Sequence, residues 1–279
     1  MQKIQLILNF ANKIRERMNK ILEKEFFSEN VAKLVVEAPA IARSRRPGHF
    51  VIVIDDSKGE RIPLTIADAD PIRGTITLII QAVGDSTRKI CGMRPGDMLH
   101  DVVGPLGRST DIQYYGTVVC AGGGVGVAPL LPIIKAMKKA GNKVISVLAA
   151  RNESLIILED QVRENSDEVI IMTDDGSAGK KGLVTQGIEE VLLREPVQMV
   201  VTIGPAIMMK FVSLLTKKYE VPTICSLNTI MVDGTGMCGA CRVSIDGKTR
   251  FVCVDGPEFD AHKVDFDEMM LRMRAYDKR

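Results

Sequence analysis

The sequence predicts an antiparallel β-barrel, then a doubly wound α/β domain with a parallel sheet, then a small C-terminal loop region that holds a metal cluster. Short β-type runs broken by Gly, Pro and Asp fill the first third, and strands alternate with helices in the middle. Closely spaced cysteines mark the end. With 279 residues, 46% of them hydrophobic, the chain is long enough for two or three domains. The expected divisions are an N-terminal extension over 1–17, the barrel over 18–113, the α/β domain over 114–222, and the cluster region with its tail over 223–279.

The barrel is expected from three runs with strand character. Residues 31–37 alternate between apolar and polar side chains, and residues 48–54 form an apolar run that the turn at 55–59 closes. Residues 74–83 form the third run. Closely spaced strands separated by turn residues are typical of an antiparallel barrel.

The α/β domain is expected from four apolar runs that alternate with helical stretches. The predicted strands cover residues 116–121, 143–149, 169–172 and 199–204, and the predicted helices cover residues 129–140, 185–194 and 206–218. This alternation indicates parallel strands joined by crossover helices.

A glycine-rich turn joins the first of these strands to the first helix. It reads Gly122, Gly123, Gly124, Val125, Gly126. Glycines let the backbone approach a dinucleotide pyrophosphate, and the helix N-terminus supplies N–H donors. The spacing differs from the commonest fingerprint, so a tight turn without a ligand is the alternative interpretation.

Further candidates follow other predicted strands, at the edge of the sheet where open α/β domains bind ligands. Asp174 and Asp175 follow one strand, and Gly204 with Pro205 follows another. A carboxylate here would accept hydrogen bonds from ribose hydroxyls and disfavour a 2′-phosphate, which favours NAD over NADP. Arg151, also at a strand end, would favour the opposite choice.

Cysteine spacing near the C-terminus indicates a [2Fe–2S] cluster. Cys238 and Cys241 are two residues apart, and Cys253 follows. The plant-type pattern is a cysteine, four residues, a cysteine, two residues, a cysteine and a distant fourth cysteine. Asp233 stands at the first position, so we expect its carboxylate to complete the ligand set with the three thiolates.

A zinc site is an alternative interpretation of these residues, because Cys and Asp also bind zinc. Structural zinc sites, however, usually pair two short hooks, and one occurs here. Asp233 as an ordinary loop residue is a second alternative. The remaining cysteines, Cys91, Cys120 and Cys225, are expected to be small buried apolar residues.

Two segments of the barrel carry candidates for a flavin. Arg61 precedes Pro63, Leu64 and Thr65; an arginine can bind a diphosphate, and a hydroxyl can bond the edge of a flavin ring. The second segment contains Val83, Gly84, Ser86 and Thr87. Taken alone, both are better interpreted as ordinary strand and turn residues, but their position before a predicted nucleotide domain favours the flavin interpretation.

The order of these motifs resembles the ferredoxin–NADP reductase superfamily over roughly residues 20–255. Its FAD motif, Arg-x-x-Ser/Thr, is loosely matched by Arg61 to Thr65 with one extra residue. Its Gly-x-x-Thr segment is matched by Gly84 and Thr87, and its Gly-Gly-Gly-x-Gly-x-x-Pro turn by residues 122–126 with Pro129. The C-terminal cluster narrows the resemblance to electron-transfer subunits similar to that of dihydroorotate dehydrogenase B.

Asp233 and the long tail after Cys253 narrow the resemblance again, to the small-subunit family of NADH-dependent reduced ferredoxin:NADP⁺ oxidoreductases. The resemblance implies an oxidoreductase subunit with FAD, a [2Fe–2S] cluster and NAD(H), NADP(H) being less favoured. It implies electron bifurcation with a larger subunit that carries flavin and [4Fe–4S] clusters, and with ferredoxin through that partner. No catalytic side chain is expected, because the cofactors carry the chemistry.

Two other functions stay open, an electron-transfer subunit of dihydroorotate dehydrogenase and a redox sensor without turnover. The net charge of +2 argues against a nucleic-acid partner. No signal peptide and no apolar run of membrane-spanning length is recognised, so we expect a cytoplasmic protein.

Overall fold

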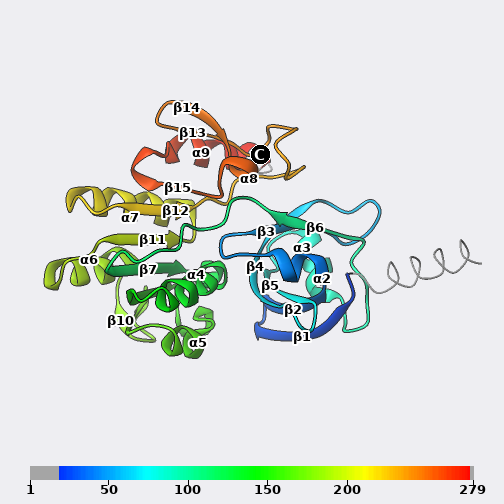
Figure 1. Ribbon diagram of the computed structural model, residues 1–279, viewed down its shortest axis with the longest axis horizontal. Coiled ribbons are helices and arrows are strands. Elements are labelled where there is room, and N and C mark those ends of the chain that lie inside the picture. The colour runs from blue at the N-terminus through cyan, green and yellow to red at the C-terminus, as the bar shows by residue number, and fades with distance from the viewer. Residues whose placement is uncertain (1–18, 277–279) are drawn as a thin grey trace, which may run out of the picture. The chain divides into compact units, whose positions relative to one another are not determined.

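The computed structural model describes residues 19–276, so the predicted extension over 1–17 lies outside the described residues. Contacts within the chain group it into two units, which are described separately (Figure 1). The first unit contains the chain up to Arg45 and Val51–Pro105. The second unit contains Arg46–Phe50 and the chain from Leu106 onward. The division into three functional regions at 113/114 and 222/223 stays a prediction.

A six-stranded sheet in the order β1-β2-β5-β4-β3-β6 forms the body of the first unit (Figure 1). The β1–β2, β2–β5 and β4–β5 pairs are antiparallel. A bridge between Lys20 and Met98 connects the start of β1 to the segment before β6. The elements are β1 Ile21–Ser28, β2 Val31–Glu37, α2 Pro39–Ser44, β3 Phe50–Ile54, β4 Ile62–Asp70, β5 Thr75–Gln81, α3 Asp85–Gly92 and β6 Asp101–Leu106.

The core of this unit follows from the alternation in its strands. Leu34 on β2 lies opposite Leu78 on β5, and both side chains are fully buried. Ile90 on α3 joins the same apolar cluster. Burying each such side chain stabilises the fold by about 1.5–3 kcal/mol. The short helices α2 and α3 were not predicted from the sequence.

The second unit is built on a seven-stranded sheet in the order β10-β9-β8-β7-β11-β12-β15. Its strands β7 to β12 are parallel, and β15 pairs antiparallel with β12 at one edge. Its elements up to the sixth parallel strand are β7 Thr117–Gly123, η1 Gly124–Gly126, α4 Val127–Lys139, β8 Lys143–Ala150, η2 Glu153–Leu155, α5 Glu159–Glu164, β9 Glu168–Thr173, β10 Lys180–Lys181, α6 Val184–Arg194, β11 Met199–Ile203, α7 Ala206–Lys218 and β12 Thr223–Ser226.

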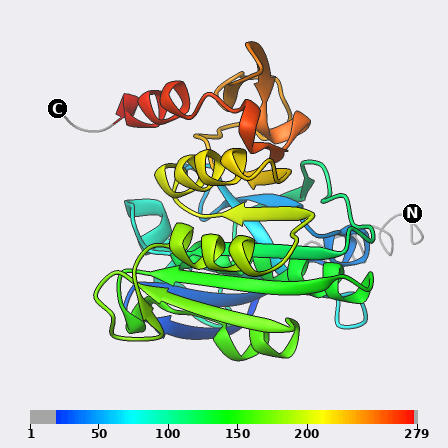
Figure 2. The ribbon, with the colours of Figure 1, turned by 90° about the vertical axis from the view of Figure 1, so that its left-hand side faces the viewer.

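Helices cover both faces of this sheet. Val119 and Ala121 of β7 pack in one cluster with Ile188 of α6 and Val212 of α7, and Figure 2 shows these two helices side by side over the strands. Helix α4 contacts β7 and β8, and its apolar residues from Val127 to Met137 are buried. The predicted doubly wound, parallel arrangement is therefore confirmed.

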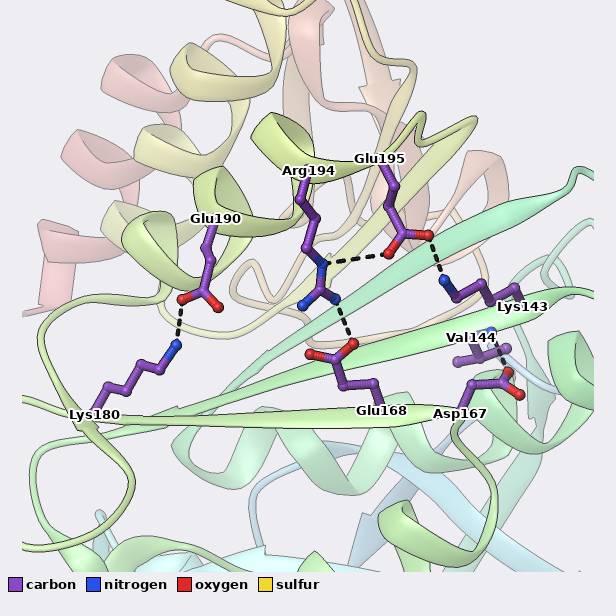
Figure 3. Close-up of polar contacts among 8 residues, drawn as sticks. All are labelled: Lys143, Val144, Asp167, Glu168, Lys180, Glu190, Arg194 and Glu195. Carbon is purple, nitrogen blue, oxygen red and sulfur yellow. Dashed lines mark hydrogen bonds and ion pairs between the residues drawn. The ribbon is translucent and has the colours of Figure 1, made fainter.

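Charged side chains at the amino-terminal edge of this sheet pair with one another (Figure 3). Lys143 at the start of β8 forms an ion pair with Glu195, and Arg194 at the end of α6 bonds Glu168 at the start of β9. Asp167 accepts a 2.8 Å hydrogen bond from the backbone N–H of Val144. Each of these exposed pairs contributes little stability. The ligand-binding edge of an open α/β sheet is the opposite one, at the carboxyl-terminal ends of the strands.

The chain after β12 forms the cluster loop and several short elements. They are β13 Arg242–Ile245, β14 Lys248–Phe251, α8 Val252–Asp255, β15 Glu258–Asp260, η3 Ala261–Lys263, α9 Phe266–Met273 and η4 Arg274–Tyr276. The sequence was expected to end in a charged tail, whereas the structure has a helix there. Asp265 caps α9 by accepting the backbone N–H of Glu268 at 2.9 Å.

Candidate functional site

The register of the parallel strands brings the predicted nucleotide residues of the second unit to one edge. Gly123 lies beside Ala149, Ala150 lies beside Thr173, and Ile203 lies beside Gly122. The glycine turn, Arg151, the two aspartates and Gly204 with Pro205 directly follow these positions. They therefore share the carboxyl-terminal edge, where open α/β sheets bind ligands.

The glycines of this turn have different roles. A Cβ at Gly122 would lie 2.9 Å from Val127 on α4, and a Cβ at Gly126 would lie 2.5 Å from the carbonyl oxygen of Ile203. These two glycines let α4 pack tightly against the sheet. Gly124 has a φ of +53° and open space where its Cβ would be. It is the position at which a pyrophosphate can approach the backbone, beside the N-terminus of α4.

Met208 fixes the neighbouring turn after β11. A Cβ at Gly123 would lie 2.4 Å from its sulfur, and a Cβ at Gly204 would lie 2.6 Å from its methyl carbon. Pro205 then precedes the first residue of α7. The structure thus places the Gly204–Pro205 turn directly beside the glycine-rich turn.

The two aspartates after β9 have different surroundings. Asp175 accepts hydrogen bonds from the backbone N–H and the hydroxyl of Ser177, at 2.9 and 2.6 Å, and these bonds lower the pKa of its carboxyl. Asp174 is exposed, and its backbone N–H bonds the carbonyl of Ala150. Asp175 therefore stabilises its own turn, and Asp174 is the carboxylate better placed to meet a ribose.

Glu258 is a feature of this edge that the sequence did not indicate. It begins β15, where it pairs with Ser226 at the end of β12. The hydroxyl of Thr110 donates a 2.5 Å hydrogen bond to it. Burial raises the pKa of its carboxyl to about 7, and the Thr110 bond acts in the opposite direction. A single glutamate after a Gly-Pro turn carries no signal in sequence from which such burial could be recognised.

The first unit brings together the two predicted flavin segments. Arg61 precedes β4, and Pro63, Leu64 and Thr65 lie on that strand. Ser86 on α3 donates a hydrogen bond to Glu60, which adjoins Arg61. Hence the start of β4 and the N-terminal end of α3 are adjacent within this unit.

The α3 end of this site is a compact turn. The hydroxyl of Thr87 accepts hydrogen bonds from the backbone N–H groups of Val83 and Gly84, at 3.1 and 2.9 Å. Val83 is exposed. Thr87 therefore shapes the turn, and the first N–H groups of α3 and the Arg61 side chain are the groups suited to a diphosphate.

The three cluster cysteines come together in the second unit. The sulfurs of Cys241 and Cys253 are 3.3 Å apart and buried, and burial together with Cys241 raises the pKa of Cys253 to about 12. Cys238 is exposed. The backbone N–H of Ala240, with that of Asp233, points at its sulfur and lowers the pKa of its thiol.

Asp233 lies in the same loop and already accepts several hydrogen bonds. One carboxylate oxygen accepts the N–H and the hydroxyl of Thr235, at 2.9 and 2.5 Å, and the N–H of Met237 at 3.2 Å. Gly234 and Gly236 have positive φ values of 83° and 89°. These glycines allow the backbone to curl around the carboxylate, next to Cys238.

This donor set fits a [2Fe–2S] cluster. Among residues 19–276, no group of three or more His, Cys, Asp or Glu side chains lies close enough together to hold a single metal ion. Four ligands that share two irons need only pairs of donors, and the Cys241–Cys253 pair and the Asp233–Cys238 neighbourhood provide them. Thiolates that lie beside backbone N–H groups favour the interpretation as an iron–sulfur cluster over the interpretation as a closed zinc site.

The fold and these sites define an oxidoreductase with a nucleotide-binding domain and an iron–sulfur domain. Residues 120–214 match the oxidoreductase NAD-binding domain, and residues 228–265 match the iron–sulfur cluster binding domain of dihydroorotate dehydrogenase B. The second match includes all four predicted cluster ligands.

Relatives that match most of the chain show the family to which it belongs. The chain is 45% identical over 259 residues to the electron transfer subunit homolog of dihydroorotate dehydrogenase B (NAD(+)) from Thermotoga maritima, covering 93% of this chain and 92% of the relative. It is 32% identical to the electron transfer subunit from Desulforamulus reducens, covering 88% and 96%. The chain belongs to the family of dihydroorotate dehydrogenase B electron transfer subunits and their homologues.

A solved structure of an NADH-dependent reduced ferredoxin-NADP oxidoreductase, studied for flavin-based electron bifurcation, is also similar. Identity is 44%, the TM-score is 0.90, and the match covers 93% of this chain and 94% of that one. The predicted fold, oxidoreductase class and cofactor classes are confirmed: an iron–sulfur domain, an NAD-binding domain and a flavin-binding fold similar to ferredoxin–NADP reductase. Within the described residues, every helix is too short or too polar to cross a membrane.

Proposed function

We propose that this chain is the electron-transfer subunit of an NADH-dependent reduced ferredoxin:NADP⁺ oxidoreductase. It would pass electrons between NAD(H), FAD and a [2Fe–2S] cluster, and onward to a larger subunit. The observation that carries the proposal is Asp233, whose carboxylate lies beside Cys238 where the first cluster ligand is expected. The 44% identity to the solved oxidoreductase over nearly the whole chain supports it.

Residues of the second unit would position the nucleotide. Gly124 would leave room for the pyrophosphate beside the N-terminus of α4, whose dipole favours negative charge, and Asp174 would accept hydrogen bonds from the ribose. When bound, the dinucleotide supplies hydride chemistry. Because Asp174 would repel a 2′-phosphate, this arrangement supports NAD(H) over NADP(H).

Residues of the first unit would hold FAD. Arg61 and the N-terminal end of α3 would neutralise the diphosphate, while Pro63, Leu64 and Thr65 on β4 would offer backbone and hydroxyl groups to the flavin ring. Bound FAD couples two-electron and one-electron chemistry. The bond between Ser86 and Glu60 keeps the two segments together.

Asp233, Cys238, Cys241 and Cys253 would hold the cluster. The two buried thiols provide a protected pair, whereas Cys238 is exposed and Asp233 is half-buried. An exposed ligand is suited to electron exchange with a second protein. We therefore infer a larger flavin and [4Fe–4S] subunit as partner, and ferredoxin through that subunit, in the cytoplasm.

The test is to purify the tagged chain anaerobically from its native host and identify the subunit that accompanies it. The expected complex reduces NADP⁺ with NADH and reduced ferredoxin together. A complex that reduces NAD⁺ with dihydroorotate and ignores ferredoxin would overturn the proposal. That result would support the second candidate, an electron-transfer subunit of dihydroorotate dehydrogenase, which the match of residues 228–265 favours.

A further inference from the structure

A cavity of about 270 Å³ lies beside the loop that connects Cys238 to Cys241. Three segments of the second unit line it. They contribute Thr229 and Ile230, Ala240 and Arg242, and Met269 and Arg272. Ala240 adjoins the cluster site through its backbone N–H, which points at the Cys238 sulfur. The other five residues belong to none of the nucleotide, flavin or cluster sites described above.

Two guanidinium groups converge on this cavity. Arg242 donates a 3.2 Å hydrogen bond to the carbonyl of Gly239, and Arg272 donates a 3.4 Å bond to the carbonyl of Ala240. Within residues 19–276, neither arginine has a carboxylate within 4.0 Å. Each guanidinium has five N–H donors, so most of them remain for another acceptor.

The rest of the lining is apolar apart from one hydroxyl. Ile230 and Met269 contribute apolar surface, and the buried hydroxyl of Thr229 has no hydrogen-bond partner among the described residues. A buried hydroxyl without a partner costs free energy until it finds one. Two guanidinium groups and a hydroxyl, lining a cavity together with apolar side chains, match an anionic headgroup on a small apolar body.

We propose that this cavity is a binding site for a small anion of the carboxylate or phosphate type. The anion bridges Arg242 and Arg272 and gives the Thr229 hydroxyl an acceptor. Because Ala240 lies between two predicted cluster ligands, a bound anion also disfavours adding an electron to the cluster. The site would thus make the reduction potential of the cluster depend on a metabolite anion.

Calorimetry on the anaerobically purified full-length protein tests binding directly. The probes are inorganic phosphate and, separately, malonate, titrated at low ionic strength with sodium chloride as the ionic control. Saturating NAD⁺ keeps phosphate out of the nucleotide site. We expect saturable one-to-one binding of at least one probe, and the tighter probe identifies the headgroup.

Variants separate this site from a general charge effect. Arg242→Gln and Arg272→Gln should each weaken binding about tenfold or more, because each removes charge-assisted hydrogen bonds. Arg250→Gln is the matched control, since Arg250 is exposed on β14 opposite Val243 of the same hairpin. It should leave the binding constant unchanged.

Thr229→Val distinguishes a ligand site from a structural role. This substitution should weaken binding of the anion roughly threefold, and it should raise the midpoint of thermal unfolding of the anion-free protein. A second readout is the cluster potential, which should become more negative with the bound probe and stop responding in Arg272→Gln. The proposal is overturned if neither probe binds saturably, or if the Arg250→Gln change matters as much as the other two. The calorimetric result does not depend on which partner subunit the protein has.

Discussion

The hydroxyl of Thr110 donates a 2.5 Å hydrogen bond to the half-buried carboxyl group of Glu258, 148 residues away in sequence. Burial raises the pKa of the Cys120 and Cys225 thiols. The charge of Glu258 raises both further, and for Cys225 the charge of Asp260 contributes more than that of Glu258. Both thiols therefore stay neutral around pH 7. Among Glu258, Cys120 and Cys225, Glu258 is therefore the residue that changes charge near neutral pH.

Stability should therefore fall as the pH rises toward and through 7. Burial raises the pKa of Glu258 to about 7, so the folded protein keeps a proton that the unfolded chain releases near pH 4.5. Below about pH 4.5 this difference in pKa contributes fully to the free energy of unfolding. Once the pH exceeds 7, the contribution, about 3 kcal/mol, is lost. Glu258→Gln should remove this dependence, as measured by urea unfolding between pH 5 and 8.

Two further variants check the assignment to Glu258. Thr110→Val removes the bond that opposes the raised pKa, so it should move the transition to higher pH. Glu190→Gln alters an exposed glutamate paired with Lys180 (Figure 3) and should leave the slope above pH 5 in place. An unchanged slope in Glu258→Gln would show that another group titrates.

Gly124→Ala should weaken NADH binding without unfolding the turn. A methyl group at this position would enter the open space in which the pyrophosphate is proposed to bind. We therefore expect the Kd for NADH to increase about tenfold or more. Gly247 also has a positive φ and open surroundings, on a distant hairpin, so Gly247→Ala controls for backbone strain. Gly126→Ala should instead reduce stability, by about 1–3 kcal/mol, since its methyl meets backbone. Equal NADH affinity in Gly124→Ala and the parent would remove this turn from the site.

NADH should reduce the flavin better than NADPH does, and Asp174 should set this preference. Replacing Asp174 with Ala removes the repulsion of a 2′-phosphate and should reduce the preference about tenfold. Asp175→Ala disturbs the bonds to Ser177 and should affect stability more than selectivity. Stopped-flow reduction with both nucleotides measures this, and faster reduction of the parent by NADPH would contradict it. Absence of any bleaching by NADH would favour the redox-sensor alternative.

The anaerobically purified chain should contain about two irons with sulfide and one FAD. Asp233→Ala should lose the cluster, whereas Asp233→Cys should keep it with a changed spectrum and potential. Asp233→Asn keeps acceptors for Thr235 and Met237 but lacks the charge, so it separates turn formation from iron binding. Stoichiometric zinc without sulfide would contradict the cluster. Normal iron and an unaltered spectrum in Asp233→Ala would make Asp233 a loop residue.

Long helices and strands were predictable, because the spacing of their apolar side chains shows which face is buried. Helix α7 spans Ala206–Lys218 as predicted, and α6 begins one residue earlier than expected. The glycine turn was predictable for a similar reason, since several glycines in a row between a strand and a helix have few other uses.

Short elements near the C-terminus were missed, although two of them carried local signals. Asp246 and Gly247, both at positive φ, form the turn of the β13–β14 hairpin, and Asp-Gly is typical of such turns. Asp265 followed by Glu268 marks the start of α9. The raised pKa of Glu258 was not predictable, because it depends on segments distant in sequence coming together.

Residues 46–50 belong to the second unit, although the chain on both sides of them belongs to the first. A Cβ at Gly48 would lie 2.7 Å from the hydroxyl of Thr110, and a Cβ at Gly107 would lie 2.9 Å from the ring of Phe50. A gene fragment that begins at residue 106 would therefore lack a five-residue piece of its own packing. Splitting this protein for biophysical work requires either supplying that pentapeptide in trans or permuting the chain, because no single cut yields two complete halves.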